Sequence, residues 1–317
     1  MSTEQSFKVA TKKRAYVVKV KVVPGRRAQR PFSYGFDFGG RKLGCVAVTV
    51  NVPDPELAAS DPRFAELEAR KSTAFVSWIG YDARCSLDAD LPGGEGTRHM
   101  VRTALTFVKR TCPWVDAFSL SDAVTVTCAE GQRVDLASLS WAEHGKTYYE
   151  RYFGATISDP GLAAMYAGDT ARMSDPEAKP HSYEAWARSV AVPAALDGVV
   201  RRPYETSATY VDFFRALKKS SGTAYCRSVH PWIDAFVRTV LTREYWSTTW
   251  RFDAAKVAPV EFDVTPAGVV AGGTSLGTAP LKRPAGPRRR RSPCWGRRAS
   301  LSGPCRSSRR RCPAAGP

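Results

Sequence analysis

Apolar and polar residues alternate along the first 80 residues in the way that β-strands require. Lysine alternates with valine in residues 14–23, and an aromatic residue recurs at every second position from 32 to 38. An apolar run at 43–50 follows Gly39 and Gly40, so these segments predict a strand and then a hairpin. A further strand is expected at 73–81, and Asp61 followed by Pro62 predicts the start of a short helix to residue 70.

The hydrophobic period changes from two to that of a helix after residue 90. Met100, Val101, Ala104, Leu105 and Val108 fall on one face of a helix predicted over about 97–110. A buried strand at 113–120, a hairpin with arms at 124–128 and 133–137, and a helical segment at 136–153 are expected next. Later helices are predicted from Ser182, at 208–219 and at 231–242.

These elements predict a mixed α+β fold. We expect a mostly antiparallel sheet flanked by helices over residues 1–157 and a mainly helical extension packed on the sheet over 158–264. A disordered Arg/Pro-rich tail is expected over 265–317. At 317 residues and 43% hydrophobic content, the chain is long and apolar enough to fill a core.

The net charge of +17 comes mostly from the tail. Residues 281–317 hold 12 lysines and arginines and no acid. The preceding residues hold the other 35 bases and all 30 acids, a net charge of +5. The tail consists mostly of Pro, Arg, Ser, Gly, Ala and Cys, which buries too little apolar surface to offset the entropy of ordering. Its arginine cluster at 288–291 fits phosphate binding or a nuclear address, and the tail equally fits an incidental composition.

Cysteine and histidine spacing gives no metal motif. The eight cysteines form no CxxC pair and no Cys/His cluster of zinc-ligand spacing. We therefore expect free thiols and no structural metal. No segment approaches the roughly 20 apolar residues of a membrane span, and the first residues lack the apolar stretch of a secretory signal. We expect an intracellular protein that makes no membrane contact, in the cytoplasm, with the nucleus or a virion as alternatives.

Three glycines stand at the entrance of the helix predicted over 97–110. Gly93, Gly94 and Gly96 permit close approach to the backbone. The first amides of a helix have no partner within the helix and lie at its positive end. The pattern therefore fits a cradle for an anion such as a diphosphate, and it equally fits a tight loop facing solvent. It is not a P-loop, since no Gly-Lys-Ser/Thr follows, and the third glycine of the dinucleotide-binding fingerprint is missing.

The order of strand, glycine turn, helix, strand and a helix carrying TYYERYFGA resembles the GCN5-related N-acetyltransferase family over residues 73–155. The family's phosphate-binding signature is Gln/Arg-x-x-Gly-x-Gly/Ala, and Gly94 and Gly96 occupy its two small positions. Residues 149–154 are similar to the family's Tyr-Glu-Lys-x-Gly-Phe segment, with Phe and Gly transposed. The whole string, including GTRHM and CPWVDAFSLSD, also resembles uncharacterised proteins of large DNA viruses.

The resemblance implies an acetyl-CoA-dependent transfer to an unidentified small-molecule or protein amine. Its diphosphate would lie on the amides of residues 93–98, including Thr97, with Arg98 adding charge. Its pantetheine arm would pair with the splayed edges of strands 73–81 and 114–120. Tyr149 matches the family's tyrosine that protonates the departing thiolate, with Tyr148 as its competitor. An aromatic helix face in the core is the alternative reading of these tyrosines.

Three departures from the family pattern leave other functions open. Leu91 stands in place of Gln or Arg, and no helix is expected between the first two strands. Strand 73–80 carries no acidic base, and three nearby acids are candidates: Asp116, Asp122 and Glu143. The alternatives are a non-catalytic scaffold of the same fold, and a virion-associated protein that uses the basic tail on nucleic acid or an acidic partner.

Overall fold

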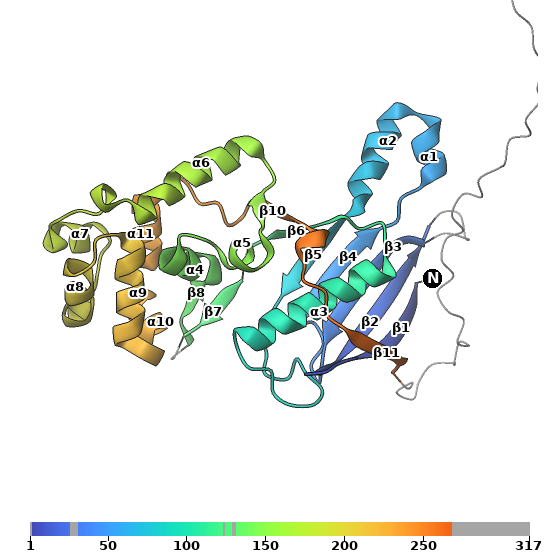
Figure 1. Ribbon diagram of the computed structural model, residues 1–317, viewed down its shortest axis with the longest axis horizontal. Coiled ribbons are helices and arrows are strands. Elements are labelled where there is room, and N and C mark those ends of the chain that lie inside the picture. The colour runs from blue at the N-terminus through green and yellow to red at the C-terminus, as the bar shows by residue number, and fades with distance from the viewer. Residues whose placement is uncertain (1, 26–30, 123, 129–130, 268–317) are drawn as a thin grey trace, which may run out of the picture. The chain divides into compact units, whose positions relative to one another are not determined.

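The computed structural model describes residues 2–25, 31–122, 124–128 and 131–267, all within one compact unit, Met1–Val270. The fold is mixed α/β with a large, mostly antiparallel sheet and helices, as the sequence predicted (Figure 1). The tail from residue 268, where disorder was expected, lies outside the described residues.

The main sheet has nine strands in the order β11-β1-β2-β3-β4-β5-β6-β10-β9. These are β1 (Thr3–Thr11), β2 (Ala15–Pro24), β3 (Pro31–Gly39), β4 (Val46–Asn51), β5 (Thr73–Ile79), β6 (Ala117–Ser121), β9 (Thr156–Ile157), β10 (Thr249–Asp253) and β11 (Phe262–Pro266). A separate hairpin pairs β7 (Thr125–Thr127) with β8 (Arg133–Asp135), at the position that the sequence predicted.

One face of the sheet packs against α3 (Glu95–Thr111). In β2 the valines at 18 and 20 are buried, whereas Lys21 is exposed. The apolar face predicted for the helix, which includes Met100 and Leu105, is buried as well. Phe107 of α3 meets Phe36 of β3 edge to face at 6.1 Å between ring centres. The buried residues recur at every second position in the strand and along one face of the helix. These two apolar faces therefore pack together into one shared core between helix and sheet.

β5, α3 and β6 form a crossover unit. β5 and β6 are the one parallel pair among the described strands, and α3 connects them. A parallel pair needs a crossover connection, which the predicted helix supplies. This unit contains the glycine turn and therefore positions the candidate site.

The remaining helices lie on either side of this unit in the sequence. Before β5 come α1 (Pro55–Ser60) and α2 (Pro62–Ala69), each started by an aspartate that caps its first amides. After β8 come α4 (Leu136–His144) and α5 (Tyr148–Phe153). Both α4 and α5 end at a glycine with positive φ, Gly145 and Gly154.

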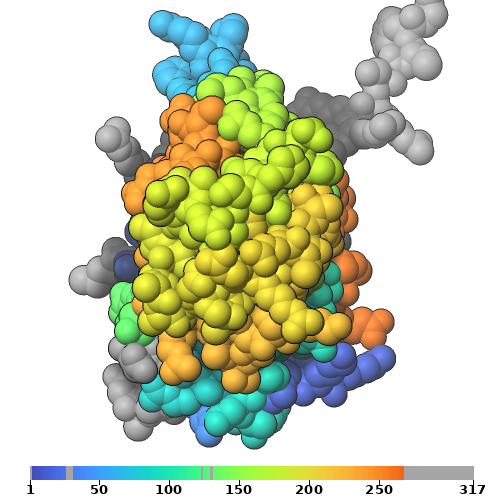
Figure 2. All heavy atoms as spheres, turned by 90° about the vertical axis from the view of Figure 1, so that its left-hand side faces the viewer, coloured from blue at the N-terminus to red at the C-terminus, as the bar shows by residue number. Residues whose placement is uncertain are grey.

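The segment between β9 and β10 is helical. It contains α6 (Pro160–Ala171), α7 (Tyr183–Ser189), α8 (Asp197–Glu205), α9 (Tyr210–Ser221), α10 (Tyr225–Val229) and α11 (Ile233–Val240). Aromatic rings fill its core: Trp186 stacks on Tyr204 at 4.2 Å between ring centres, and Phe214 stacks on Trp232 at 5.7 Å. In Figure 2 these helices face the viewer. Rings of this size bury a large apolar area, and this burial is the main contribution to the stability of the helical segment.

Several strands of the sheet come from segments where none was expected. β1 pairs with β2, and β11 pairs with β1, so Thr265 and Pro266 end a strand although the sequence placed them in the tail. β10 lies beside β6, although residues 158–264 were expected to be mainly helical. Residues 113–116 precede β6, with a turn at 113–114, and are not part of the strand.

The prediction of free thiols is wrong for four cysteines. Cys45 is bonded to Cys85 and Cys128 to Cys226, across sequence separations of 40 and 98. Such bonds join segments that only the tertiary fold brings together, so the absence of CxxC pairs carried no information about them. Cys112 is free and buried.

No helix among the described residues has the length and apolar character needed to cross a membrane. Nor does any group of three or more His, Cys, Asp and Glu side chains among them have an arrangement that could hold a metal ion.

Candidate functional site

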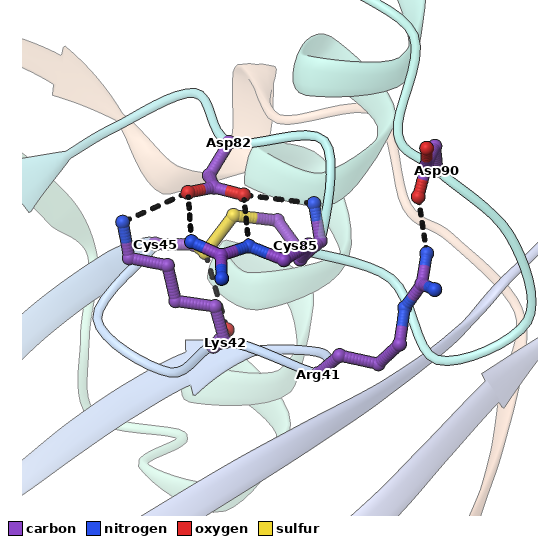
Figure 3. Close-up of polar contacts among 7 residues, drawn as sticks. Arg41, Lys42, Cys45, Asp82, Cys85 and Asp90 are labelled. Carbon is purple, nitrogen blue, oxygen red and sulfur yellow. Dashed lines mark hydrogen bonds and ion pairs between the residues drawn. A yellow bond between two sulfur atoms is a disulfide. The ribbon is translucent and has the colours of Figure 1, made fainter.

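The loop between β5 and α3, residues 80–94, is anchored to the β3–β4 hairpin. The Cys45–Cys85 disulfide crosses between them, and the Asp82 carboxylate accepts from Lys42 Nζ at 2.8 Å (Figure 3). Arg41 forms an ion pair with Asp90 near the end of the loop. The glycine turn therefore follows a loop whose course is fixed by covalent and ionic contacts.

The three glycines at the helix entrance have different surroundings. Gly94 is the residue before α3 and has φ +68°, a conformation that favours glycine. A Cβ on Gly96 would lie 2.8 Å from the ring of Pro92 and 3.2 Å from Leu91, so close packing requires glycine there. A Cβ on Gly93 would meet nothing within 4 Å, and Gly93 is exposed. The entrance is thus filled by protein on the side of Gly96 and open to solvent on the side of Gly93.

Leu91 departs from the family signature because it belongs to the core. Its side chain is 1% exposed, and its amide donates to Ala83. A Gln or Arg in that place would bury a polar group, which is costly without a partner.

The charges at the entrance are balanced by a local ion pair. No side chain in the described part of the chain caps the first amides of α3, and the carboxylate of Glu95 lies 2.8 Å from the guanidinium of Arg98. Thr97 is half-buried beside them. Glu95 is exposed, and its negative charge near the helix N-terminus competes with any anion for the same amides and for Arg98.

A series of rings joins this entrance to α5. The guanidinium of Arg98 lies 4.7 Å from the ring centre of Tyr152, and that of Arg151 lies 5.0 Å from the same ring. Tyr148 follows at 4.8 Å from Tyr152, and Tyr149 at 5.4 Å from Tyr148, between ring centres. The structure therefore brings together the two segments that the sequence singled out, the glycine turn and the TYYERYF helix.

Two polar atoms beside this series are buried without a hydrogen-bond partner among the described residues: the Oη of Tyr148 and the Nε of Arg102. Burial raises the pKa of Tyr148 to about 12, although the charges of Arg98 and Arg102 oppose that rise. Buried polar groups are normally paired, so an unpaired phenol beside arginines fits a place for an anionic or hydrogen-bonding group.

β5 pairs with β6 over its first four residues and extends beyond the end of β6. Their pairing ends at Val76 with Leu120, after which β5 continues along β4, where Ile79 pairs with Val46. Beyond β6, the amide of Asp122 donates to the carbonyl of Trp246 at 3.1 Å.

A cavity of about 50 Å³ lies where the pairing of the two strands ends. It is lined by Val76, Ser77, Trp78, Ile79, Leu120, Ser121, Val124 and Tyr149. It has room for a small group, so most of any larger ligand would lie outside it. Two larger hollows, of about 520 and 440 Å³, are lined by other residues, and neither includes the glycine turn or Tyr149.

Tyr149 stands in the wall of this cavity and is 2% exposed. Burial raises the pKa of Tyr149 well above 10, and the negative charge of Asp122 raises it further. The phenol therefore remains protonated at neutral pH and can donate a hydrogen bond, and its raised pKa makes it a weaker acid than a free phenol. α5 holds it in place through a capping box in which Thr147 and Glu150 satisfy each other's amides.

Of the three acids that the sequence left as candidate bases, Asp122 is the one that is buried and forms no ion pair among the described residues. Asp116 is exposed and lies 3.8 Å from Arg251, and Glu143 is held by Lys218 at 2.6 Å. Asp122 is 2% exposed, and neither of its carboxylate oxygens has a hydrogen-bond partner among the described residues.

Burial raises the pKa of Asp122 to about 7. The charges of Asp135 and Glu150 add to the rise, and the nearby amide of Val124 opposes it. Asp122 is therefore a carboxyl group that changes charge near neutral pH, one residue beyond the cavity-lining Ser121. The sequence offered only one signal for it, its position at the end of an apolar strand.

The sequence predicted the site's segments but not its shape. The positions of Arg102 and Arg151 and the burial of Asp122 depend on contacts between distant segments. A comparison of the chain with protein-family models, curated proteins and solved structures found no match.

Proposed function

We propose that this protein binds acetyl-CoA and transfers its acetyl group to an amine, in the manner of the GCN5-related N-acetyltransferases that residues 73–155 resemble. The observation that carries the proposal is a small cavity, lined in part by Tyr149, at the point where the pairing of the parallel strands β5 and β6 ends. Strand edges that separate leave main-chain groups without sheet partners, and these can pair with an extended ligand arm.

The residues present fit the acyl donor in three places. The cavity would take the acetyl end, and Tyr149 at its wall holds a proton that a leaving thiolate can accept. The exposed side of the helix entrance, at Gly93 and Gly94, would take the diphosphate. Arg98 would add charge, with the unpaired groups of Tyr148 and Arg102 nearby. The donor supplies the activated acetyl group, and the chain supplies position, charge and protons.

Titration calorimetry with acetyl-CoA tests the proposal. We expect the wild type to bind, and Gly93→Asp to weaken binding at least tenfold because a carboxylate would stand where the diphosphate lies. Gly93 has open space and no positive φ, so the substitution adds little strain. Gly168→Asp on α6, where a Cβ also meets nothing, is the matched control and should bind as the wild type does. No heat of binding by the wild type at millimolar acetyl-CoA would refute the proposal.

A second function concerns the basic tail. Its 12 lysines and arginines without an acid favour attachment to nucleic acid or to an acidic partner. Deletion of residues 281–317 should remove binding to a DNA duplex, and binding by the full chain should weaken steeply with salt. DNA binding that is unchanged after the deletion would refute a role of the tail in this attachment.

A further inference from the structure

We propose that a hollow between α4, α11 and the segment before β10 binds a free amino acid with an apolar side chain, as the zwitterion. The hollow has a volume of about 520 Å³, which is in the range of small-molecule sites. It includes neither the glycine turn nor Tyr149. The inference therefore goes beyond the proposed function and does not depend on acetyl-CoA binding.

The walls of the hollow come from segments far apart in the sequence, and direct contacts fix their positions. Trp141 of α4 packs on Phe236 of α11, with 6.1 Å between ring centres (Figure 1). The indole Nε1 of Trp246, in the segment before β10, donates to the Oγ of Ser138 on α4 at 3.2 Å. The hollow is therefore built into the fold, as a preformed ligand site is.

Side chains of both charges line the hollow, and none of them forms an ion pair among the described residues. The acids are Asp135, Asp234 and Glu244, and the bases are Arg238 and Arg243. The arginines repel a simple cation and the acids repel a simple anion. A ligand that carries one charge of each sign gains from both sets.

Asp135 is the acid that most lacks a partner. It precedes α4 at the N-cap position, yet its carboxylate accepts from no amide of that helix. Asp61 and Asp159, at the same position before α2 and α6, both cap their helices. Asp135 is half-buried, and burial raises its pKa, as do the charges of Asp234 and Glu244. An ammonium in the hollow would supply the partner that this carboxylate lacks.

The rest of the lining fits the rest of an amino acid. The guanidinium of Arg238 can form two parallel hydrogen bonds to a carboxylate. Ser138 is 1% exposed, and its hydroxyl donates to no group among the described residues, so it can donate to a ligand oxygen. Val237, Leu241 and Trp246 add apolar surface. These groups favour an amino acid with an apolar side chain.

Titration calorimetry at pH 7 compares three ligands that share a phenyl ring and differ in charge. L-phenylalanine carries both charges, 2-phenylethylamine only the ammonium and 3-phenylpropionate only the carboxylate. We expect L-phenylalanine to bind about tenfold more tightly than either analogue, or better, because each analogue leaves one set of charges without a partner. Equal affinity for L-phenylalanine and either analogue would overturn the proposal, as would no binding of L-phenylalanine or L-leucine at about 10 mM.

Two variants locate the charges. Asp135→Asn should lower the affinity for L-phenylalanine about tenfold or more, and leave that for 3-phenylpropionate unchanged or higher. Arg238→Gln should lower the affinity for L-phenylalanine by a similar factor, and leave that for 2-phenylethylamine unchanged or higher. Asp263→Asn is the matched control, because Asp263 is an exposed acid on β11 outside the hollow, and it should bind all three ligands as the wild type does.

Thermal unfolding of each variant separates loss of the site from loss of the fold. An affinity for L-phenylalanine that neither variant lowers would overturn the proposal. Equal losses for all three ligands would overturn it too, because they would show a structural effect without a role for either charge.

Discussion

The carboxylate of Asp169 accepts a hydrogen bond from the phenol of Tyr245 at 2.8 Å, and both side chains are buried. The same carboxylate accepts from the amide and hydroxyl of Thr242 at 2.9 and 2.7 Å and pairs with Arg172 at 3.0 Å. Asp169 therefore ties α6 to the segment between α11 and β10. That segment continues to Trp246, whose carbonyl accepts a hydrogen bond from the main-chain amide of Asp122.

Substitution of Asp169 by Asn should destabilise the fold by about 3 kcal/mol, because buried donors and Arg172 lose their charged acceptor. Burial alone would raise the pKa of Asp169, but hydrogen bonds from Thr242 and Tyr245 and the charge of Arg172 lower it below 3.8. The contribution is therefore present above pH 3.8 and is lost as pH falls through the lower pKa of the folded state. Urea unfolding at several pH values checks this, and a variant as stable as the wild type at pH 7 would contradict it.

Asp122 should have the opposite effect on stability. Its pKa is about 7 in the folded state and 3.8 as a model value, so the unfolded chain ionises first and stability falls as pH rises from about 4 to 7. Above pH 7 the loss amounts to about 4 kcal/mol at most. Asp122→Asn should therefore unfold at a higher urea concentration than the wild type at pH 8, and at nearly the same concentration at pH 4. A lower urea midpoint for Asp122→Asn than for the wild type at pH 8 would contradict the raised pKa of Asp122.

The two disulfides should each stabilise the folded chain by about 2–5 kcal/mol, because they close long loops in the unfolded state. Dithiothreitol should lower the melting temperature of the wild type. The double variant Cys128→Ala/Cys226→Ala should melt lower without reductant and respond less to it. Alkylation of the native protein followed by peptide mapping should leave Cys45, Cys85, Cys128 and Cys226 unlabelled. Labelling of these four before unfolding would contradict the pairing.

Glu95 should weaken the binding of a diphosphate at the entrance of α3. Its carboxylate lies near the first amides of the helix and holds Arg98 at 2.8 Å. Glu95→Gln should raise the affinity for acetyl-CoA by about threefold at low salt, in line with the 0.3–1 kcal/mol typical of such charges. Glu66→Gln is the control, since Glu66 is also an exposed acid paired with an arginine, Arg70. An equal gain in the control would mean that only the net charge matters.

The sequence was most informative where one segment determines its own structure. The alternation of polar and apolar residues in β2 and the apolar face of α3 predicted both elements and their buried sides. The prediction works because the buried side chains of a strand or a helix recur at a fixed spacing in the sequence. β10 was missed because it is short and pairs with β6, which lies far back in the chain. The disulfides were missed because each also joins residues that lie far apart in the sequence.

The candidate site was predictable in part, for a related reason. Glycine is required at 94 by a positive φ and at 96 by close contact with Pro92, and both requirements arise from residues nearby in the sequence. The pairing of Arg98 with Tyr152 and the isolation of Asp122 arise from α5 and the segment before β10. Periodicity carries no information on such contacts. A polar residue in an apolar strand end is a weak signal until its partners are known.

Tyr149 and Tyr148 allow a direct test of which phenol serves the reaction, because they are adjacent on α5 and differ in surroundings. Tyr149 lines the cavity between β5 and β6, whereas the Oη of Tyr148 is buried without a partner. Tyr149→Phe should lower the rate of acetyl transfer by about 100-fold and leave acetyl-CoA binding unchanged, because it removes the proton donor and keeps the ring. Tyr148→Phe should leave the rate within a few-fold and the melting temperature unchanged or higher, because it removes an unsatisfied hydroxyl. Loss of rate in Tyr148→Phe alone would move the acid from Tyr149 to Tyr148, and loss in neither would remove a phenol from the mechanism.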